Sequence, residues 1–283
     1  MTSASAVAAR RWGMAYTTMT WAAAVAAWLV TLRAAGHPET TIRTKRQHVE
    51  QAAHELRGDP WSVTPDRLLG YMARHEWMPE TRHAHRTSLR GFYAWGVRAG
   101  HLETSPADDL PPVRRTPPRP RPLPEGMFRA ALEQAGPKVR LMVLLAGDNG
   151  LRRAEIAVVH TLDVLGDPGR YSLVVHGKGG KERVVPIADT LARVILAARG
   201  YLFPGQISGH VSPAHVGKLV SALLPDHWTT HTLRHRFATR AYAIDHDLFT
   251  VQELLGHASA DTTRRYVALP DDAKRRLVAA IAA

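Results

Sequence analysis

The stretch SPADDLPPVRRTPPRPRPLP, residues 105–124, divides the chain in two. It contains eight prolines and four arginines, and proline lacks the amide hydrogen that helices and sheets use. This composition favours an extended polyproline conformation. The sequence therefore predicts a linker at 105–124, preceded by a tail over 1–19 and a first domain over 20–104, and followed by a second domain over 125–283. The linker arginines could follow a phosphate backbone or simply be solvated.

Composition narrows the class of protein. The chain has 283 residues, of which 45% are hydrophobic and 22% charged, as is typical of folded globular domains. Its formal net charge of +12 at pH 7 favours a polyanionic partner, nucleic acid before an anionic membrane surface. The chain has no cysteine, which excludes disulfides, thiolate zinc sites and cysteine catalysis and is compatible with a reducing, intracellular compartment. The uncharged run from Met14 to Leu32 is rich in Ala and Thr, so we expect a buried helix rather than a membrane span.

Helical patterns dominate the first domain. Segments 21–36, 37–56, 64–76 and 79–100 are bounded by the proline, glycine and acidic residues that mark helix ends, which predicts four helices. In the last of them, apolar side chains recur at helical spacing as a core stripe. The basic residues beside such stripes could contact DNA or form a solvated face. The candidate DNA contacts are Arg43, Lys45, Arg46, Arg82, Arg86 and Arg90.

The second domain combines helices with three short strands. Segments 161–170, 171–180 and 181–187 are rich in β-branched residues and separated by glycine or proline turns. From Asp189 onward the pattern is helical again, and residues 268–283 begin like a helix N-terminus, with a proline and two aspartates. The predicted fold is therefore mainly α with a small antiparallel β-sheet.

Two segments of this domain carry cations suited to phosphate chemistry. In GLRRAEI, Glu155 follows Arg152 by three residues and shares its helix face, where it could hold the guanidinium. In HGKGGKER, Lys178 lies in a glycine-rich hairpin turn that lets the backbone approach a ligand. A surface arginine and a turn lysine are the alternative interpretations. The nucleotide-binding pattern GxxxxGK[ST] is absent around Lys178.

Two later segments supply histidine and tyrosine. HTLRH pairs His231 with Arg234 on one helix face, and LGHASADTTRRY contains His257 and Tyr266. A chance pair of histidines is the alternative in a chain with 16 of them. HTLRH lacks the glutamate of the zinc-protease motif HExxH, and no metal site is expected.

In this order, GLRRAEI, HGKGGKERVVPI, HTLRHRFAT and LLGHASADTTRRYVAL closely resemble the tyrosine recombinases, the family of phage integrases and of bacterial recombinases that resolve chromosome dimers. The stretch RTSLRGFYAWGVRAGHLETSPADDL also resembles the end of the family's core-binding domain. The resemblance thus runs from about residue 20 to the C-terminus. It implies an N-terminal helical, SAM-like core-binding domain and a C-terminal mixed α/β catalytic domain.

The resemblance also implies a mechanism. Two guanidiniums would clamp the charge that develops on a phosphodiester under attack, and Tyr266 would attack to give a 3′-phosphotyrosyl enzyme. His231 is the candidate to assist the tyrosine, Lys178 the candidate general acid for the leaving 5′-hydroxyl, and Glu155 a supporting residue. No ATP, metal or other cofactor is implied. The six implied catalytic residues are Arg152, Lys178, His231, Arg234, His257 and Tyr266.

The implied partner is double-stranded DNA at core sites, bound by four protomers in the bacterial cytoplasm and not at a membrane. The terminal helix would dock on a neighbouring protomer, and a directionality factor is a further candidate partner. Only about 20 residues precede the first helix, which resembles a short phage or mobile-element integrase without an arm-binding domain. The alternatives are a chromosome- or plasmid-dimer recombinase, a catalytically idle DNA-binding regulator and a type IB topoisomerase.

Overall fold

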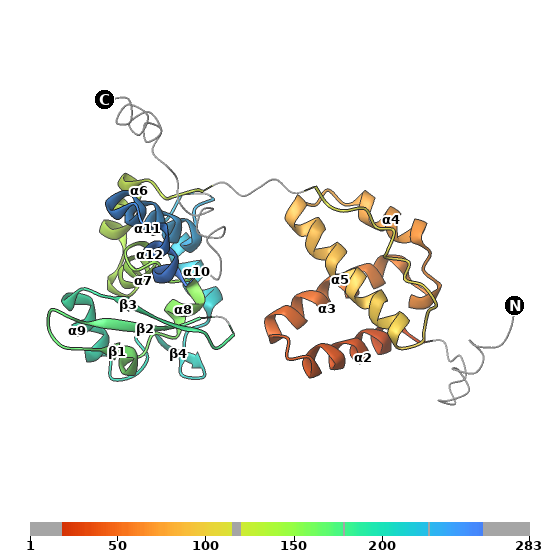
Figure 1. Cartoon of the computed structure of the whole chain (residues 1–283), viewed down its shortest axis with the longest axis horizontal. Helices are drawn as coiled ribbons and strands as arrows, with labels where there is room; N and C mark the ends of the chain where they lie inside the picture. The colour runs from red at the N-terminus through yellow and green to blue at the C-terminus, as the bar shows by residue number, and fades with distance from the viewer. Residues whose placement is uncertain (1–18, 115–119, 178, 226, 257–283) are drawn as a thin grey trace, which may run out of the picture. The chain divides into compact units, whose positions relative to one another are not determined.

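The chain forms two compact units, which divide between residues 117 and 118 (Figure 1). The computed structural model describes residues 19–114, 120–177, 179–225 and 227–256. Each unit has its own hydrophobic core. No helix in these ranges combines the length and the apolar character that crossing a membrane requires.

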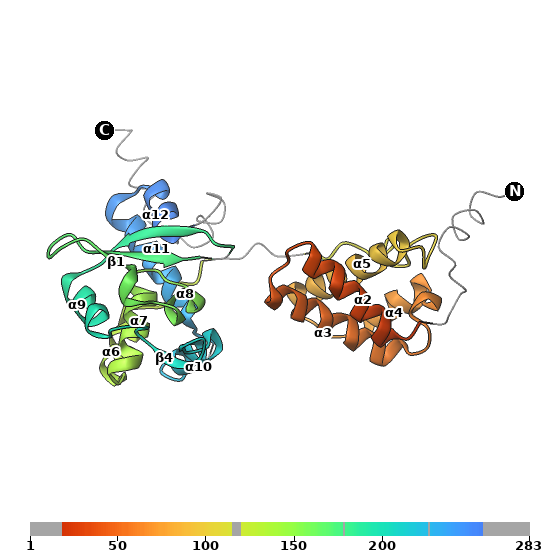
Figure 2. The same ribbon diagram turned by 90° about the horizontal axis from the view of Figure 1, so that it is seen from below.

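The first unit is built from helices, and the four predicted from the sequence are confirmed. They are α2 (Trp21–Ala34), α3 (Glu39–Leu56), α4 (Pro65–Arg74) and α5 (Pro79–Arg98), with a short 3-10 turn at Pro60–Ser62. Figure 2 shows them as one bundle. The ends form where the sequence signals them: the side chain of Thr20 accepts a hydrogen bond from the Ala23 amide, which satisfies one of the unpaired donors of the first turn.

Aromatic packing fills the core of the first unit. The rings of Trp21, Trp28 and Trp61 lie 5.7, 5.5 and 5.4 Å from that of Phe92. Ala107 and Leu110 are buried in the same core. The front of the proline-rich stretch is therefore part of the first unit rather than free linker.

A three-stranded antiparallel sheet lies along one side of the second unit. Its strands are β1 (Val164–Leu165), β2 (Ser172–His176) and β3 (Glu182–Pro186), in the order β1-β2-β3. Leu173 pairs with Val185, and both face the core. The predicted strands are confirmed. A further strand, β4 (Pro204–Ile207), was not predicted.

Helices complete the second unit and share its core with the inner face of this sheet (Figures 1 and 2). Leu123 is buried in its core, and the Leu123 amide donates to the Thr232 carbonyl at 3.1 Å. The rear of the proline-rich stretch is therefore part of the second unit. The helices are α6 (Glu125–Gln134), α7 (Pro137–Gly147), α8 (Arg153–Ala157), α9 (Asp189–Ala197), α10 (Pro213–Ser221), α11 (Thr230–Asp245) and α12 (Leu248–Leu255). The helix predicted over 268–283 lies outside the described residues.

Candidate active site

Glu155 is the centre of the candidate site. It lies in the first turn of α8 and is only 3% exposed. One carboxylate oxygen, Oε2, accepts from the Arg152 amide at 2.8 Å, and the other, Oε1, accepts from Arg152 Nη1 at 2.6 Å. The first contact is a helix-capping bond and the second a charge-assisted one. Glu155 therefore fixes both the backbone and the side chain of Arg152. The predicted contact forms, but through a capping box rather than a shared helix face, because Arg152 is the extended N-cap of α8.

A second arginine, which the sequence reasoning missed, grips the same carboxylate. Arg183 Nη1 and Nη2 donate to Glu155 Oε1 and Oε2 at 3.0 and 2.8 Å, a two-pronged ion pair. Its Nε donates to the Leu254 carbonyl at 2.7 Å. A signal existed: Arg183 pairs with buried Val175 and precedes buried Val185 by two residues, so it occupies an inward position of β3. A charge at such a position indicates a buried partner.

Arg234 completes the cluster from α11. It is 1% exposed, and its Nη1 lies 3.7 Å from Glu155 Oε2. The guanidinium also donates to the backbone carbonyls of Gly150 and Leu255. Arg152 and Arg234, which are 82 positions apart (234 − 152), thus meet at one carboxylate.

His231 lies in the first turn of α11, three residues before Arg234. The residue is open to solvent on one side. Desolvation of its ring, followed by the positive charges of Arg234 and Arg152, lowers the pKa of His231. The imidazole is therefore neutral at pH 7 and can accept a proton.

The cluster carries a surplus of positive charge. Burial acts to raise the pKa of Glu155, but its hydrogen bonds and ion pairs, those with Arg183 foremost, bring the pKa below its usual range. Three guanidiniums around one carboxylate leave a formal excess of +2 (3 − 1). Such a cluster is suited to an anion with several oxygens, such as a phosphodiester. Among the residues in the described ranges, no group of three histidine or acidic side chains could hold a metal ion.

Three of the candidate residues, Lys178, His257 and Tyr266, lie outside the described residues. The hairpin around position 178 is closed by a bond of 2.7 Å from the Gly177 amide to the Lys181 carbonyl. The roles of Lys178, His257 and Tyr266 stay predictions.

Two candidate DNA contacts on α5 are engaged within the first unit. Arg82 donates to the carbonyls of Met72 and His75 at 2.7 and 2.6 Å. Arg86 donates to the Leu110 carbonyl at 3.1 and 2.8 Å through two of its nitrogens. These guanidiniums bind the C-terminal end of α4 and the segment that follows α5.

Of the other four candidates, Arg43 and Arg46 are exposed, whereas Lys45 and Arg90 are partly buried. Lys45 lies 5.9 Å from the ring of Trp28, and partial burial lowers its pKa. Arg43 is exposed on α3. The remaining two form ion pairs near the surface, Arg90–Asp108 at 3.6 Å and Arg46–Glu50 at 2.7 Å.

The sequence of this chain is similar to those of known proteins. The sequence model of the phage integrase family matches residues 127–272. The tyrosine recombinase XerC of Xanthomonas campestris pv. campestris (strain B100) is 30% identical over 213 residues, which cover 68% of this chain and 64% of the relative. XerC of Methylobacterium sp. (strain 4-46) is 37% identical over 212 residues, 63% of this chain and 64% of the relative. The chain thus spans slightly less than two thirds of these curated relatives.

Solved structures show the same fold. A lambda integrase dimer bound to a COC′ core site superposes with a TM-score of 0.72 at 18% identity, over 92% of this chain and 84% of that one. The family model covers residues 127–272, more than half of the chain, and this range includes all six implied catalytic residues. The chain belongs to the phage integrase family of tyrosine recombinases.

Proposed function

We propose that the protein is a site-specific DNA recombinase that cuts and rejoins DNA strands through a 3′-phosphotyrosyl intermediate. One observation carries the proposal: Arg152 and Arg234 meet at the buried carboxylate of Glu155, with His231 in the first turn of the same helix as Arg234. The surplus positive charge is held by contacts that exist before any substrate binds. Preorganised charge of this kind stabilises the transition state of phosphoryl transfer.

The proposed cleavage step balances without a cofactor. The Tyr266 oxygen attacks the scissile phosphorus, and the bond from phosphorus to the 5′-oxygen breaks. Neutral His231 takes up the phenolic proton, and Lys178 gives a proton to the departing 5′-oxygen. Arg152 and Arg234 hold the non-bridging oxygens while their charge increases. The new phosphotyrosine ester conserves the energy of the broken bond, so a 5′-hydroxyl of another strand can reverse the step.

The proposed partner is double-stranded DNA at paired core sites, with four protomers on two sites. The basic net charge and the two-unit architecture support it. Two solved structures with a similar fold are a lambda integrase dimer bound to a core site and a lambda integrase tetramer bound to a Holliday junction. A directionality factor is a further proposed partner, and the proposed place of action is DNA in the bacterial cytoplasm.

We propose integration and excision of a phage or mobile element as the biological role. The alternative is resolution of chromosome or plasmid dimers, which the similarity to proteins named XerC supports. Mapping the cleaved site separates the two, since an element carries sites at its ends, whereas dimer resolution uses one site per replicon.

A nicked suicide duplex containing the site tests the activity. Loss of the short strand after cleavage traps the phosphotyrosyl adduct, which is then visible as a slower band on a denaturing gel. Wild type should form the adduct and Tyr266→Phe should not. A wild-type protein that binds the site without forming the adduct would favour an idle DNA-binding regulator, and supercoil relaxation by single protomers would favour a topoisomerase.

A further inference from the structure

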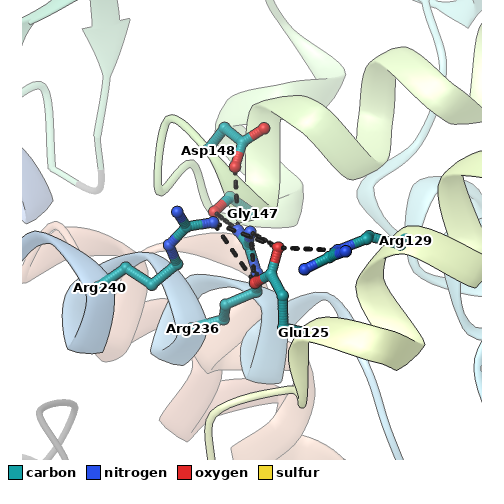
Figure 3. Close-up of polar contacts among 6 residues, drawn as sticks. All are labelled: Glu125, Arg129, Gly147, Asp148, Arg236 and Arg240. Carbon is teal, nitrogen blue, oxygen red and sulfur yellow. Dashed lines mark hydrogen bonds and ion pairs between the residues drawn. The ribbon is translucent and has the colours of Figure 1, made fainter.

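The turn that leads into Arg152 is held at both ends by α11. α7 ends at Gly147, and Gly150 has a positive φ of 68°. Arg234 donates to the Gly150 carbonyl. Arg236, two residues further along α11, donates through Nη1 to the Gly147 carbonyl at 2.7 Å and to Asp148 Oδ1 at 2.9 Å (Figure 3). The two arginines therefore fix the start and the end of the turn over 147–150.

The two glycines of the turn are closely packed against aromatic rings. A Cβ at Gly147 would lie 2.5 Å from the ring of Phe128 on α6, and one at Gly150 would lie 2.5 Å from the ring of Phe237 on α11. The guanidinium of Arg236 stacks on the same Phe128 ring, 3.5 Å from its centroid. Close packing on both sides means that a shift of α11 or α6 would displace the turn, and with it Arg152.

Arg236 is joined to the start of α6 as well. Its Nε and Nη2 donate to the two carboxylate oxygens of Glu125 at 2.9 and 3.1 Å (Figure 3). Glu125 directly follows the proline-rich stretch. Upstream of it, the Leu123 amide donates to the Thr232 carbonyl of α11 at 3.1 Å. The end of the proline-rich stretch is thus attached to the helix that bears His231 and Arg234.

The ion pairs of Arg236 are only partly shielded from water. The Arg236 side chain is 3% exposed, but those of Glu125 and Asp148 are 40% and 45% exposed, so solvent screens their contribution to stability. Among the residues that the structure describes, the hydrogen bonds of its guanidinium go to the turn before Arg152 or to Glu125.

We propose that Arg236 is a positioning residue for strand cleavage. It fixes the position of Arg152 through the turn 147–150. Through Glu125 it links that position to the end of the proline-rich stretch. The inference rests on the proposed recombinase function, because it assigns Arg236 an effect on the same phosphoryl-transfer step.

The test compares Arg236→Gln with Arg240→Gln. Arg240 also contacts Glu125, at 3.3 Å, but its side chain is 56% exposed and, within the described part of the chain, it makes no hydrogen bond or ion pair to the turn. Arg236→Gln should lower the single-turnover rate of adduct formation on the suicide duplex by about 10- to 100-fold, the effect of a displacement of about 1 Å in a catalytic group. DNA affinity should change by less than about twofold, because no phosphate contact is lost. Arg240→Gln should cleave like wild type.

A neutral substrate makes the test specific for Arg152. A methylphosphonate at the scissile position replaces one charged non-bridging oxygen with a methyl group. The transition state then carries less negative charge for Arg152 to stabilise. The defect of Arg236→Gln should shrink on this substrate. Glu125→Gln, which keeps one acceptor oxygen, should show a smaller defect of the same kind, so the test does not depend on one variant folding.

The outcomes separate the two proposals. If wild type forms no adduct on either substrate, the proposed function fails and this inference falls with it. If wild type forms the adduct and Arg236→Gln cleaves at the same rate but melts earlier, Arg236 is structural only. A defect equally large on the phosphodiester and on the methylphosphonate would also overturn the inference.

Discussion

Arg183 and Arg234 donate to two neighbouring carbonyls, those of Leu254 and Leu255. These carbonyls lie at the end of α12, where the last carbonyl groups of a helix have no donor within the helix. Both arginines also lie against the Glu155 carboxylate, at 2.8 and 3.7 Å. The charge cluster that holds Arg152 is therefore also the cap of the helix that precedes His257 in the sequence.

Replacing Arg183 should affect both stability and cleavage. Arg183→Gln removes a buried ion-pair partner, and we expect the free energy of unfolding to fall by about 3 kcal/mol. Cleavage on the suicide duplex should slow by about tenfold or more, since Glu155 and the end of α12 lose a shared partner. Chemical denaturation and single-turnover assays measure the two effects. Arg193→Gln, on the exposed surface of α9, is the control, and equal behaviour of the two variants would contradict the role given to Arg183.

A side chain at Gly256 is expected to destabilise the protein. Its φ is +61°, and a Cβ there would lie 2.9 Å from Arg183 Cδ. Gly256→Ala should cost about 1 to 2 kcal/mol for the left-handed backbone, and more for the displaced Arg183. Gly169→Ala is the matched control, because φ is +87° and its Cβ would meet no described atom within 4 Å. Thermal melting should show a larger loss for Gly256→Ala, and equal losses would argue against close packing on Arg183.

The first unit should lose stability in mild acid through His85. The residue is 3% exposed, and its ring lies 4.0 Å from that of His48 and 3.9 Å from that of Trp77. Burial, with the charges of His48 and His75, lowers the pKa of His85 from 6.5 to about 4. The folded state then binds fewer protons than the unfolded state between these values, so the free energy of unfolding falls as the pH falls from about 6.5 to about 4.

His85→Phe should flatten this dependence, because phenylalanine keeps the ring stacking and does not titrate. Denaturant unfolding at pH 7.5 and pH 5 measures the difference, with His37→Phe as an exposed control. A pH dependence that is identical in wild type and His85→Phe would place its origin elsewhere.

Arg43 and Arg82 should respond differently to truncation. Arg43 is exposed, so Arg43→Ala should weaken DNA binding, reduce the slope of log K against log salt by about 0.9, and leave the melting temperature unchanged. Arg82→Ala leaves the carbonyls of Met72 and His75 without their donor and should cost about 1 to 3 kcal/mol of stability. Fluorescence-anisotropy titrations at several salt concentrations, with melting curves, check both. A loss of DNA affinity without a loss of stability in Arg82→Ala would contradict this structural role and support Arg82 as a DNA contact.

Local patterns were enough to predict the helices and the hairpin, because helix ends and turns are set by nearby prolines, glycines and β-branched residues. β4 could not be predicted, since Pro204 and Gly205 break the strand pattern and its pairing is a single bridge from Pro204 to His210. The sequence also predicted the contact between Arg152 and Glu155 from their i, i+3 spacing, but not its form, since Arg152 is the extended N-cap of α8 and not part of the helix face. It could not show that Arg236 binds Glu125, 111 positions away, because only the packing of α6 and α11 against α7 brings them together.

Several guanidiniums of this chain donate to backbone carbonyl groups, and this affects which positions can be substituted. A backbone oxygen is present whatever side chain its residue carries, so positions such as Leu254 and Met72 can change identity and still accept the same bond. Arg183 and Arg82 have no such freedom, since lysine offers no planar fork and glutamine no charge. For the hydrogen bonds themselves, tolerance to substitution should therefore be one-sided, permissive at the acceptor and strict at the arginine, while the packing of Met72 and Leu254 against the two cores limits their side chains separately.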